Sequence, residues 1–134
     1  MEHSVALVDD HHLVRAGLVA TIRTFGGFRV TMEAAHGGEL VDLLAEGEPP
    51  AIAIVDLNMP VMDGFQTIAW LRENAPSVKP LALTFDASDD AMLRAVRVGA
   101  RGFLLKDAHP SVLKNAMESL VLTGFYYTDE LVAE

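Results

Sequence analysis

The stretch AIAIVDLNMPVMDG, residues 51–64, joins an uninterrupted apolar run to a loop that opens with an aspartate. Its first five residues are apolar, and three of them are β-branched. A short continuous run of this kind is typical of a parallel strand that is covered on both faces. We therefore predict a buried strand over 51–55, with the carboxylate of Asp56 at its carboxyl end.

Four similar runs lie on either side of this one, and segments of helical period separate them. The runs are SVALV (4–8), FRVTMEA (28–34), PLALT (80–84) and GFLLK (102–106). Apolar residues recur at helical spacing at Val14, Leu18, Ile22 and Phe25, and again at Leu113, Ala116, Met117 and Leu120. Ser88 is expected to cap a helix, and Pro110 suits the first position of the last one. Five β-α units predict a doubly wound α/β fold, a parallel five-stranded sheet with helices on both faces.

Composition narrows the class of protein. The chain has 134 residues, 51% of them hydrophobic and none of them cysteine, which fits one globular domain without disulfides or thiolate zinc sites. No apolar run reaches the ~18 residues that span a bilayer, and the acidic N-terminus lacks the features of a signal peptide. We expect a cytoplasmic protein. A net charge of −9 and the lack of a basic run predict that this chain does not bind nucleic acid directly.

Chemically active side chains lie at the carboxyl ends of four of the five predicted strands. Asp9 and Asp10 follow the first strand, Asp56 the third, while Thr84 ends the fourth and Lys106 the fifth. The carboxyl ends of parallel strands share one edge of the sheet, so these residues should converge there. Three carboxylates repel one another unless a cation offsets them, and oxygen ligands favour Mg²⁺. With an ammonium and a hydroxyl beside them, they suit a phosphoryl group arriving on an aspartate.

Each of these residues has an ordinary explanation when taken alone. Acids after a strand often cap helices, a threonine often bonds within a turn, and a lysine is usually on the surface. The combination at four strand ends is much harder to obtain by chance.

With these motifs in this order, residues 4 to about 123 resemble a response-regulator receiver domain of the CheY-like family. The resemblance rests on the acid pair, DLNMPVMDG (56–64), Thr84 and GFLLK (102–106). It implies a (βα)₅ flavodoxin-like fold with strand order 2-1-3-4-5. It also implies that Asp56 accepts the phosphoryl group from a partner histidine kinase. The chain would then be a signalling switch that hydrolyses its own aspartyl phosphate, and not an enzyme.

The resemblance assigns further roles. Asp10 and Asp56 would bind Mg²⁺ directly, with the backbone carbonyl of Asn58 as a third ligand, and Asp9 would act mainly through water. Lys106 and Thr84 would contact the phosphoryl oxygens. Phe103 would be the aromatic switch residue that turns inward with Thr84, which changes the face formed by the fourth helix, fifth strand and fifth helix.

DDHHLVRAGL (9–18), LLKD (104–107) and the C-terminal residues resemble the subgroup whose receiver precedes a LuxR-type helix-turn-helix domain. This implies a transcription regulator that binds DNA through a domain missing from these 134 residues, with a homodimer possible on phosphorylation. We expect the receiver to occupy 1–123, and 124–134 to be the start of a linker or a C-terminal tail.

Two other functions stay open at this point. LVDDHH (7–12) also fits a DHH-type metal phosphoesterase, although His3, His36 and His109 form no spaced metal motif with it. We expect His11 and His12 to be loop and helix-start side chains beside the acid pair. A pseudo-receiver that binds a partner without phosphorylation is the second alternative, against which the full set of acids, Thr84 and Lys106 argues.

Two residues depart from the family pattern. Phe85 follows Thr84, where the family usually has a small residue, and its ring could either cover the site or pack outward against the fourth helix. Asp107 follows Lys106, where many relatives have a proline in a cis peptide. Because a cis bond without proline costs ~3 kcal/mol, we expect a trans bond.

Overall fold

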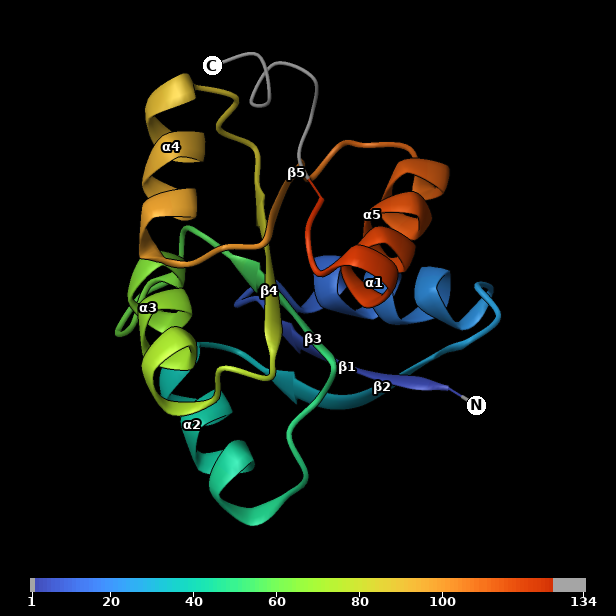
Figure 1. Ribbon diagram of the computed structural model, residues 1–134, viewed down its shortest axis with the longest axis horizontal. Helices are drawn as coiled ribbons and strands as arrows, with labels where there is room; N and C mark the ends of the chain where they lie inside the picture. Colours follow the sequence, from blue (N-terminus) through green and yellow to red (C-terminus); the bar gives the residue numbers. More distant parts are fainter. Residues whose placement is uncertain (1, 127–134) are drawn as a thin grey trace.

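A computed structural model describes residues 2–126, in which strands and helices alternate along the chain (Figure 1). The strands are β1 (His3–Val8), β2 (Phe28–Ala34), β3 (Ile52–Asp56), β4 (Lys79–Thr84) and β5 (Gly102–Leu105). The helices are α1 (His12–Arg23), α2 (Gly37–Glu46), α3 (Gly64–Asn74), α4 (Asp89–Val98) and α5 (Pro110–Thr123). Each strand predicted from the sequence is present, with its ends within one residue of the expected ones.

The strands form one parallel sheet in the order β2-β1-β3-β4-β5, which confirms the predicted fold. The pairing brings the carboxyl ends of the central strands to the same level. Val8 pairs with Val55 at the ends of β1 and β3, and Asp56 pairs with Leu83 one step further on. The chain therefore leaves β1, β3 and β4 at one edge of the sheet.

Successive residues of each strand face opposite layers of helices. Ile52 and Ile54 of β3 pack on the side of α1 and α5, while Ala53 and Val55 pack on the side of α2, α3 and α4. Figure 1 shows these two groups of helices on opposite sides of the sheet. Because both faces are covered, every residue of β3 is buried, as the apolar run at 51–55 predicts.

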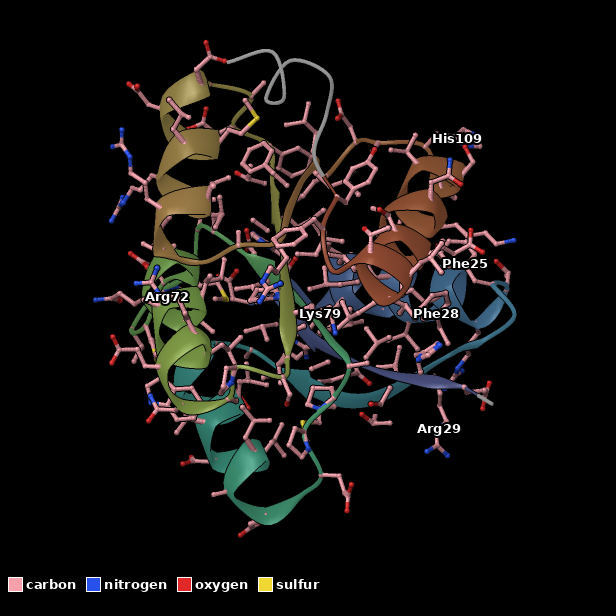
Figure 2. The ribbon with its side chains drawn as sticks, viewed as in Figure 1. Phe25, Phe28, Arg29, Arg72, Lys79 and His109 are labelled. Atoms are coloured by element: carbon pink, nitrogen blue, oxygen red, sulfur yellow. The ribbon has the colours of Figure 1, made fainter. Side chains whose placement is uncertain are left out.

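Local signals fix several helix ends. Ser88 Oγ accepts a hydrogen bond from the Ala91 N–H at the start of α4, which confirms the predicted N-cap. Pro110 is the first residue of α5, as expected, and His109 caps that helix (Figure 2). None of these helices, within residues 2–126, is long and apolar enough to cross a membrane.

The prediction that Phe25 lies on the first helix is wrong. Helix α1 ends at Arg23, and Gly27 with its φ of +93° then turns the chain into β2. Phe25 is buried all the same, because the turn folds it against the core on the α1 and α5 side together with Phe28 (Figure 2). Its burial depends on a glycine turn and not on helical period.

The chain turns back onto the sheet after α5. Gly124 ends the helix with a φ of +88°, and the Tyr126 N–H then donates to the Arg101 carbonyl at 2.8 Å. Tyr126 also pairs with Gly102 of β5. Of the expected linker at 124–134, residues 127–134 lie outside the described residues.

Candidate functional site

The carboxylates predicted to converge do so. Asp9 and Asp10 leave β1 and Asp56 ends β3, and each offers a carboxylate oxygen to a group whose members lie within 4.8 Å of one another. Asp9 is 2% exposed and Asp56 is 1% exposed, whereas Asp10 lies at the rim with a side chain 31% exposed. Buried charges of one sign require a cation nearby.

Lys106 supplies one such cation. Its side chain is 3% exposed, and Nζ lies 3.2 Å from Asp9 Oδ2 and 3.1 Å from Asp56 Oδ2. The Lys106 N–H donates to the carbonyl of Thr84 at 2.8 Å, which ties the end of β5 to β4 and holds the lysine in place. All peptide bonds of the described residues are trans, so the bond to Asp107 is as expected.

One ammonium does not fully compensate the cluster. Burial raises the pKa of the Asp56 carboxyl above its ordinary value, and the negative charge of Asp9 adds to this effect. The N–H of Asn58, 3.2 Å from Asp56 Oδ1, and the ammonium of Lys106 lower the same pKa but do not cancel the effect of burial. The pocket is therefore short of positive charge.

Thr84 is fully buried at the end of β4. Its Oγ1 accepts hydrogen bonds from Asn58 Nδ2 at 3.3 Å and from the Asp86 N–H at 3.1 Å. The Asn58 side chain thus connects the loop after Asp56 to the hydroxyl of Thr84 at the end of the neighbouring strand. Phe103 is buried too, at 7% exposed, and it pairs with Ala82, two residues before Thr84 along β4.

The loop from Asp56 to α3 depends on a close approach of two backbones. A Cβ on Gly64 would lie 2.3 Å from the carbonyl oxygen of Asp56 and 2.4 Å from Leu57 Cα, so only glycine fits there. Asp63 caps α3 by accepting from the Gln66 N–H, while the Gln66 side chain accepts from the Asp63 N–H. Gly64 thus allows the close approach to the end of β3, and Asp63 fixes the start of α3 beside it.

The donor set fits a hard divalent cation. Among the described residues, Asp9 Oδ2, Asp10 Oδ1 and Asp56 Oδ2 are buried atoms without a hydrogen-bond partner, although Lys106 Nζ lies within ion-pair distance of two of them. Carboxylate oxygens that face one another in this way are the ligands that Mg²⁺ prefers. The residues present therefore fit such an ion.

His11 lies beside the acid pair, as expected, but the sequence did not predict its contacts with the carboxylates. This residue is the N-cap of α1, and its Nδ1 lies 3.1 Å from Asp9 Oδ1 and 3.3 Å from Asp10 Oδ1. His12 instead lies beside Arg15 on the exposed side of α1. The position of His11 directly after the acid pair was the available signal, because an N-cap residue stays close to the strand end that precedes it.

Phe85 lies at the rim of the cluster. Its side chain is 68% exposed, and its ring centroid is 5.4 Å from Lys106 Nζ. A cation within about 6 Å of a ring centroid is attracted to the ring face, so the Phe85 ring and the Lys106 ammonium form a cation–π contact at the rim.

The chain has relatives among known protein families and among curated proteins. Residues 5–118 match the family model described as the response regulator receiver domain. The nitrate/nitrite response regulator protein NarL of Escherichia coli K12 is 33% identical over 114 residues, which is 85% of this chain and 52% of NarL. The response regulator GacA of Pseudomonas protegens is 31% identical over 130 residues, 97% of this chain and 60% of GacA. The chain spans about half the length of the curated relatives it matches.

Solved structures agree with this assignment. A two-component response regulator of the LuxR family from Aurantimonas sp. SI85-9A1 superposes with a TM-score of 0.88 at 30% identity, covering 99% of this chain and 94% of that one. The receiver domain of the response regulator NarL from Mycobacterium tuberculosis gives 0.85 at 30% identity, covering 91% and 98%. These findings do not favour a DHH-type phosphoesterase. The chain belongs to the response regulator receiver domain family, and its similarity is to two-component regulators of the NarL and LuxR type.

Proposed function

We propose that this domain is a phosphorylation-activated switch in which Asp56 accepts a phosphoryl group from the phosphohistidine of a partner histidine kinase. The observation that supports it is the position of the buried Asp56 Oδ2, 3.1 Å from Lys106 Nζ and within a cluster built from four strand ends. A carboxylate is a nucleophile, and a fixed ammonium offsets the charge on phosphoryl oxygens.

The transfer exchanges one bond for another. A carboxylate oxygen of Asp56 bonds to phosphorus as the phosphorus–nitrogen bond of the donor breaks, and the imidazole nitrogen keeps the electron pair and takes up a proton. The protein contributes mainly position and charge to such an in-line transfer. Lys106 would meet the phosphoryl oxygens, and the hydroxyl hydrogen of Thr84 would donate to one of them. Hydrolysis of the aspartyl phosphate by water would end the signal.

Mg²⁺ fits the oxygen-lined part of the pocket. Asp10 and Asp56 would hold it directly, with the backbone carbonyl of Asn58, while Asp9 would act mainly through water. When bound, the ion supplies charge that the single Lys106 does not provide. The buried carboxylate oxygens without hydrogen bonds support this assignment.

The output is proposed to be a change of partner. Phosphoryl charge would bias Thr84, Phe103 and the face formed by α4, β5 and α5. The buried ring of Phe103 lines a hollow between α4 and α5 together with Met92 and Val112, so a shift of the ring alters this face. We propose homodimer formation as one result.

We place the receiver at residues 1–123. Control of DNA binding would need a helix-turn-helix domain that follows it in the full-length protein. The names of several relatives describe transcriptional regulators, such as YdfI of Bacillus subtilis, 34% identical over 119 residues. This chain itself, with a net charge of −9, is not expected to bind DNA.

Intact mass spectrometry tests the proposal. Treatment with acetyl phosphate and Mg²⁺ should add one phosphate to the wild type and to Asp42→Asn, an acid of α2 outside the cluster, and none to Asp56→Asn. EDTA should abolish the reaction, and Asp10→Ala should remain unmodified with excess Mg²⁺. Equal phosphorylation of the wild type and Asp56→Asn would overturn the proposal.

A further inference from the structure

His11 adds a nitrogen donor to a pocket that sequence analysis treated as made of oxygen. Its Nδ1 lies 3.1 Å from Asp9 Oδ1, 3.3 Å from Asp10 Oδ1 and 3.9 Å from Asp56 Oδ2. The backbone N–H of His11 also donates to Asp9 Oδ1 at 2.8 Å, which fixes the residue at the mouth of the pocket. The ring nitrogen thus lies within 3.9 Å of an oxygen of each of the three carboxylates.

The spacing of these donors suits a single ion. The ligand atoms of Asp9, Asp10, His11 and Asp56 all lie within 4.8 Å of one another. The ligands of a tetrahedral Zn²⁺ ion lie about 3.3–3.6 Å apart, since each is about 2.0–2.2 Å from the metal. Small side-chain movements therefore bring four donors to one centre.

A second observation points to a cation in this place. Asp9 and Asp56 are 2% and 1% exposed, and among the described residues the buried Oδ2 atom of each has no hydrogen-bond partner beyond the shared ammonium of Lys106. Lys106 is the one ammonium within ion-pair distance of them among the described residues. Buried carboxylate oxygens are stabilised by a directly bound metal ion more strongly than by a shared ammonium.

We infer that His11 makes this pocket a mixed nitrogen and oxygen site that also takes a divalent ion with a preference for imidazole, such as Zn²⁺, in competition with Mg²⁺. Imidazole suits Zn²⁺, Ni²⁺ and Cu²⁺, whereas Mg²⁺ is bound by oxygen. His11 is therefore expected to set the preference between the two kinds of ion. The inference rests on the proposed metal site at Asp10 and Asp56.

The neighbouring histidine is a matched control. His12 is exposed, and its Nδ1 lies 2.9 Å from Arg15 Nη2, outside the donor group. A phosphoesterase site built on the paired histidines would need both residues. The present inference needs His11 alone.

Isothermal titration calorimetry of residues 1–134 with ZnCl₂ and, separately, MgCl₂ tests this. In His11→Ala, Zn²⁺ affinity should fall at least about tenfold, since loss of even an outer-shell partner of a metal ligand costs about 10–100-fold, while Mg²⁺ affinity stays within about twofold. His12→Ala should leave both within about twofold. Since the His11 side chain makes no capping hydrogen bond to α1, the alanine variant should keep its fold, and His11→Gln offers a second variant without a ring.

Long-range ¹H–¹⁵N spectra of the histidines give a readout independent of affinity. One imidazole should shift on adding Zn²⁺, and this signal should be missing from His11→Ala. Unchanged Zn²⁺ affinity in both His11 variants, with Mg²⁺ still bound, would overturn this inference and leave the proposed function standing. Equal losses in His11→Ala and His12→Ala would overturn it too. Wild-type protein that binds neither ion would contradict both the inference and the proposed metal site.

Discussion

Lys106 Nζ lies 3.1 Å from Asp56 Oδ2 and shares its charge with Asp9 Oδ2 at 3.2 Å. One ammonium therefore serves two buried carboxylates, while Asp10 adds a third negative charge at the rim. The arrangement costs stability as long as no further cation is bound, and it leaves a strong local attraction for one.

The first prediction concerns the stability cost of Asp56. In buffer with EDTA at pH 7, Asp56→Asn should raise the free energy of unfolding by about 1 kcal/mol, because a poorly compensated buried charge is replaced by a neutral amide and Lys106 keeps Asp9. Burial raises the folded-state pKa of Asp56 above the ordinary 3.8, so the charge is unfavourable at pH values above the folded-state pKa.

The pH dependence of this effect has a definite sign. At pH values below 3.8, the ordinary pKa, Asp56 is protonated in both the folded and the unfolded protein. The difference in the free energy of unfolding between wild type and Asp56→Asn should therefore vanish at these pH values. Urea denaturation at a series of pH values from 7 downward measures this difference. A variant less stable than wild type at pH 7 would mean that Lys106 fully compensates Asp56.

The second prediction concerns Phe85, whose exposed ring lies over Lys106 Nζ. The ring should hinder both the approach of small donors and the attack of water on the aspartyl phosphate. Phosphorylation and dephosphorylation should therefore both become faster in Phe85→Ala, with the phosphate still on Asp56. Intact mass against time measures both rates.

The changes in the phosphorylation and dephosphorylation rates of Phe85→Ala distinguish three outcomes. A faster phosphorylation alone would show that the ring blocks donors and not water. Rates within about twofold of wild type, a barrier change of roughly 0.4 kcal/mol, would show that the ring does not gate the site.

The third prediction concerns Val61, in the loop after Asp56. Among the described residues it is the single non-glycine with a positive φ, at +69°, and its side chain is 85% exposed. A β-branched residue in this region is strained by about 1–2 kcal/mol. Glycine removes that strain but adds freedom to the unfolded chain, which offsets roughly half of it.

Val61→Gly should consequently raise the free energy of unfolding by about 0.5–1 kcal/mol, which denaturant titration detects. Val61→Ala, which keeps a Cβ in the same backbone conformation, is the control and should gain less. A glycine variant no more stable than wild type would show that the loop holds no such strain.

Much of the fold could be predicted from sequence because its signals are local. The apolar residues at 5–8 and 52–55 are buried, as their continuous runs predict, and the cap at Ser88 and the start of α5 at Pro110 follow from single residues. The convergence of Asp9, Asp56 and Lys106 followed from one topological rule, that parallel strands end at the same edge.

Other features depend on tertiary geometry that the sequence does not express. Phe25 continues a helical spacing but lies after the end of α1, because the glycine turn that follows buries it in another way. His11 points into the acid cluster only because the chain turns sharply from β1 into α1. The pairing of Tyr126 with Gly102 needs the whole of α5 to bring the chain back to β5.

The central claim is that Asp56, and no other acid of the cluster, carries the phosphoryl group. Borohydride reduces an acyl phosphate to an alcohol, which converts a phosphorylated aspartate to homoserine and leaves free carboxylates intact. After treatment with acetyl phosphate and Mg²⁺, reduction and proteolysis, tandem mass spectrometry should find homoserine at position 56 alone, and at no position when the donor is left out. Homoserine at position 9 or 10, or at none of the three, would contradict the account.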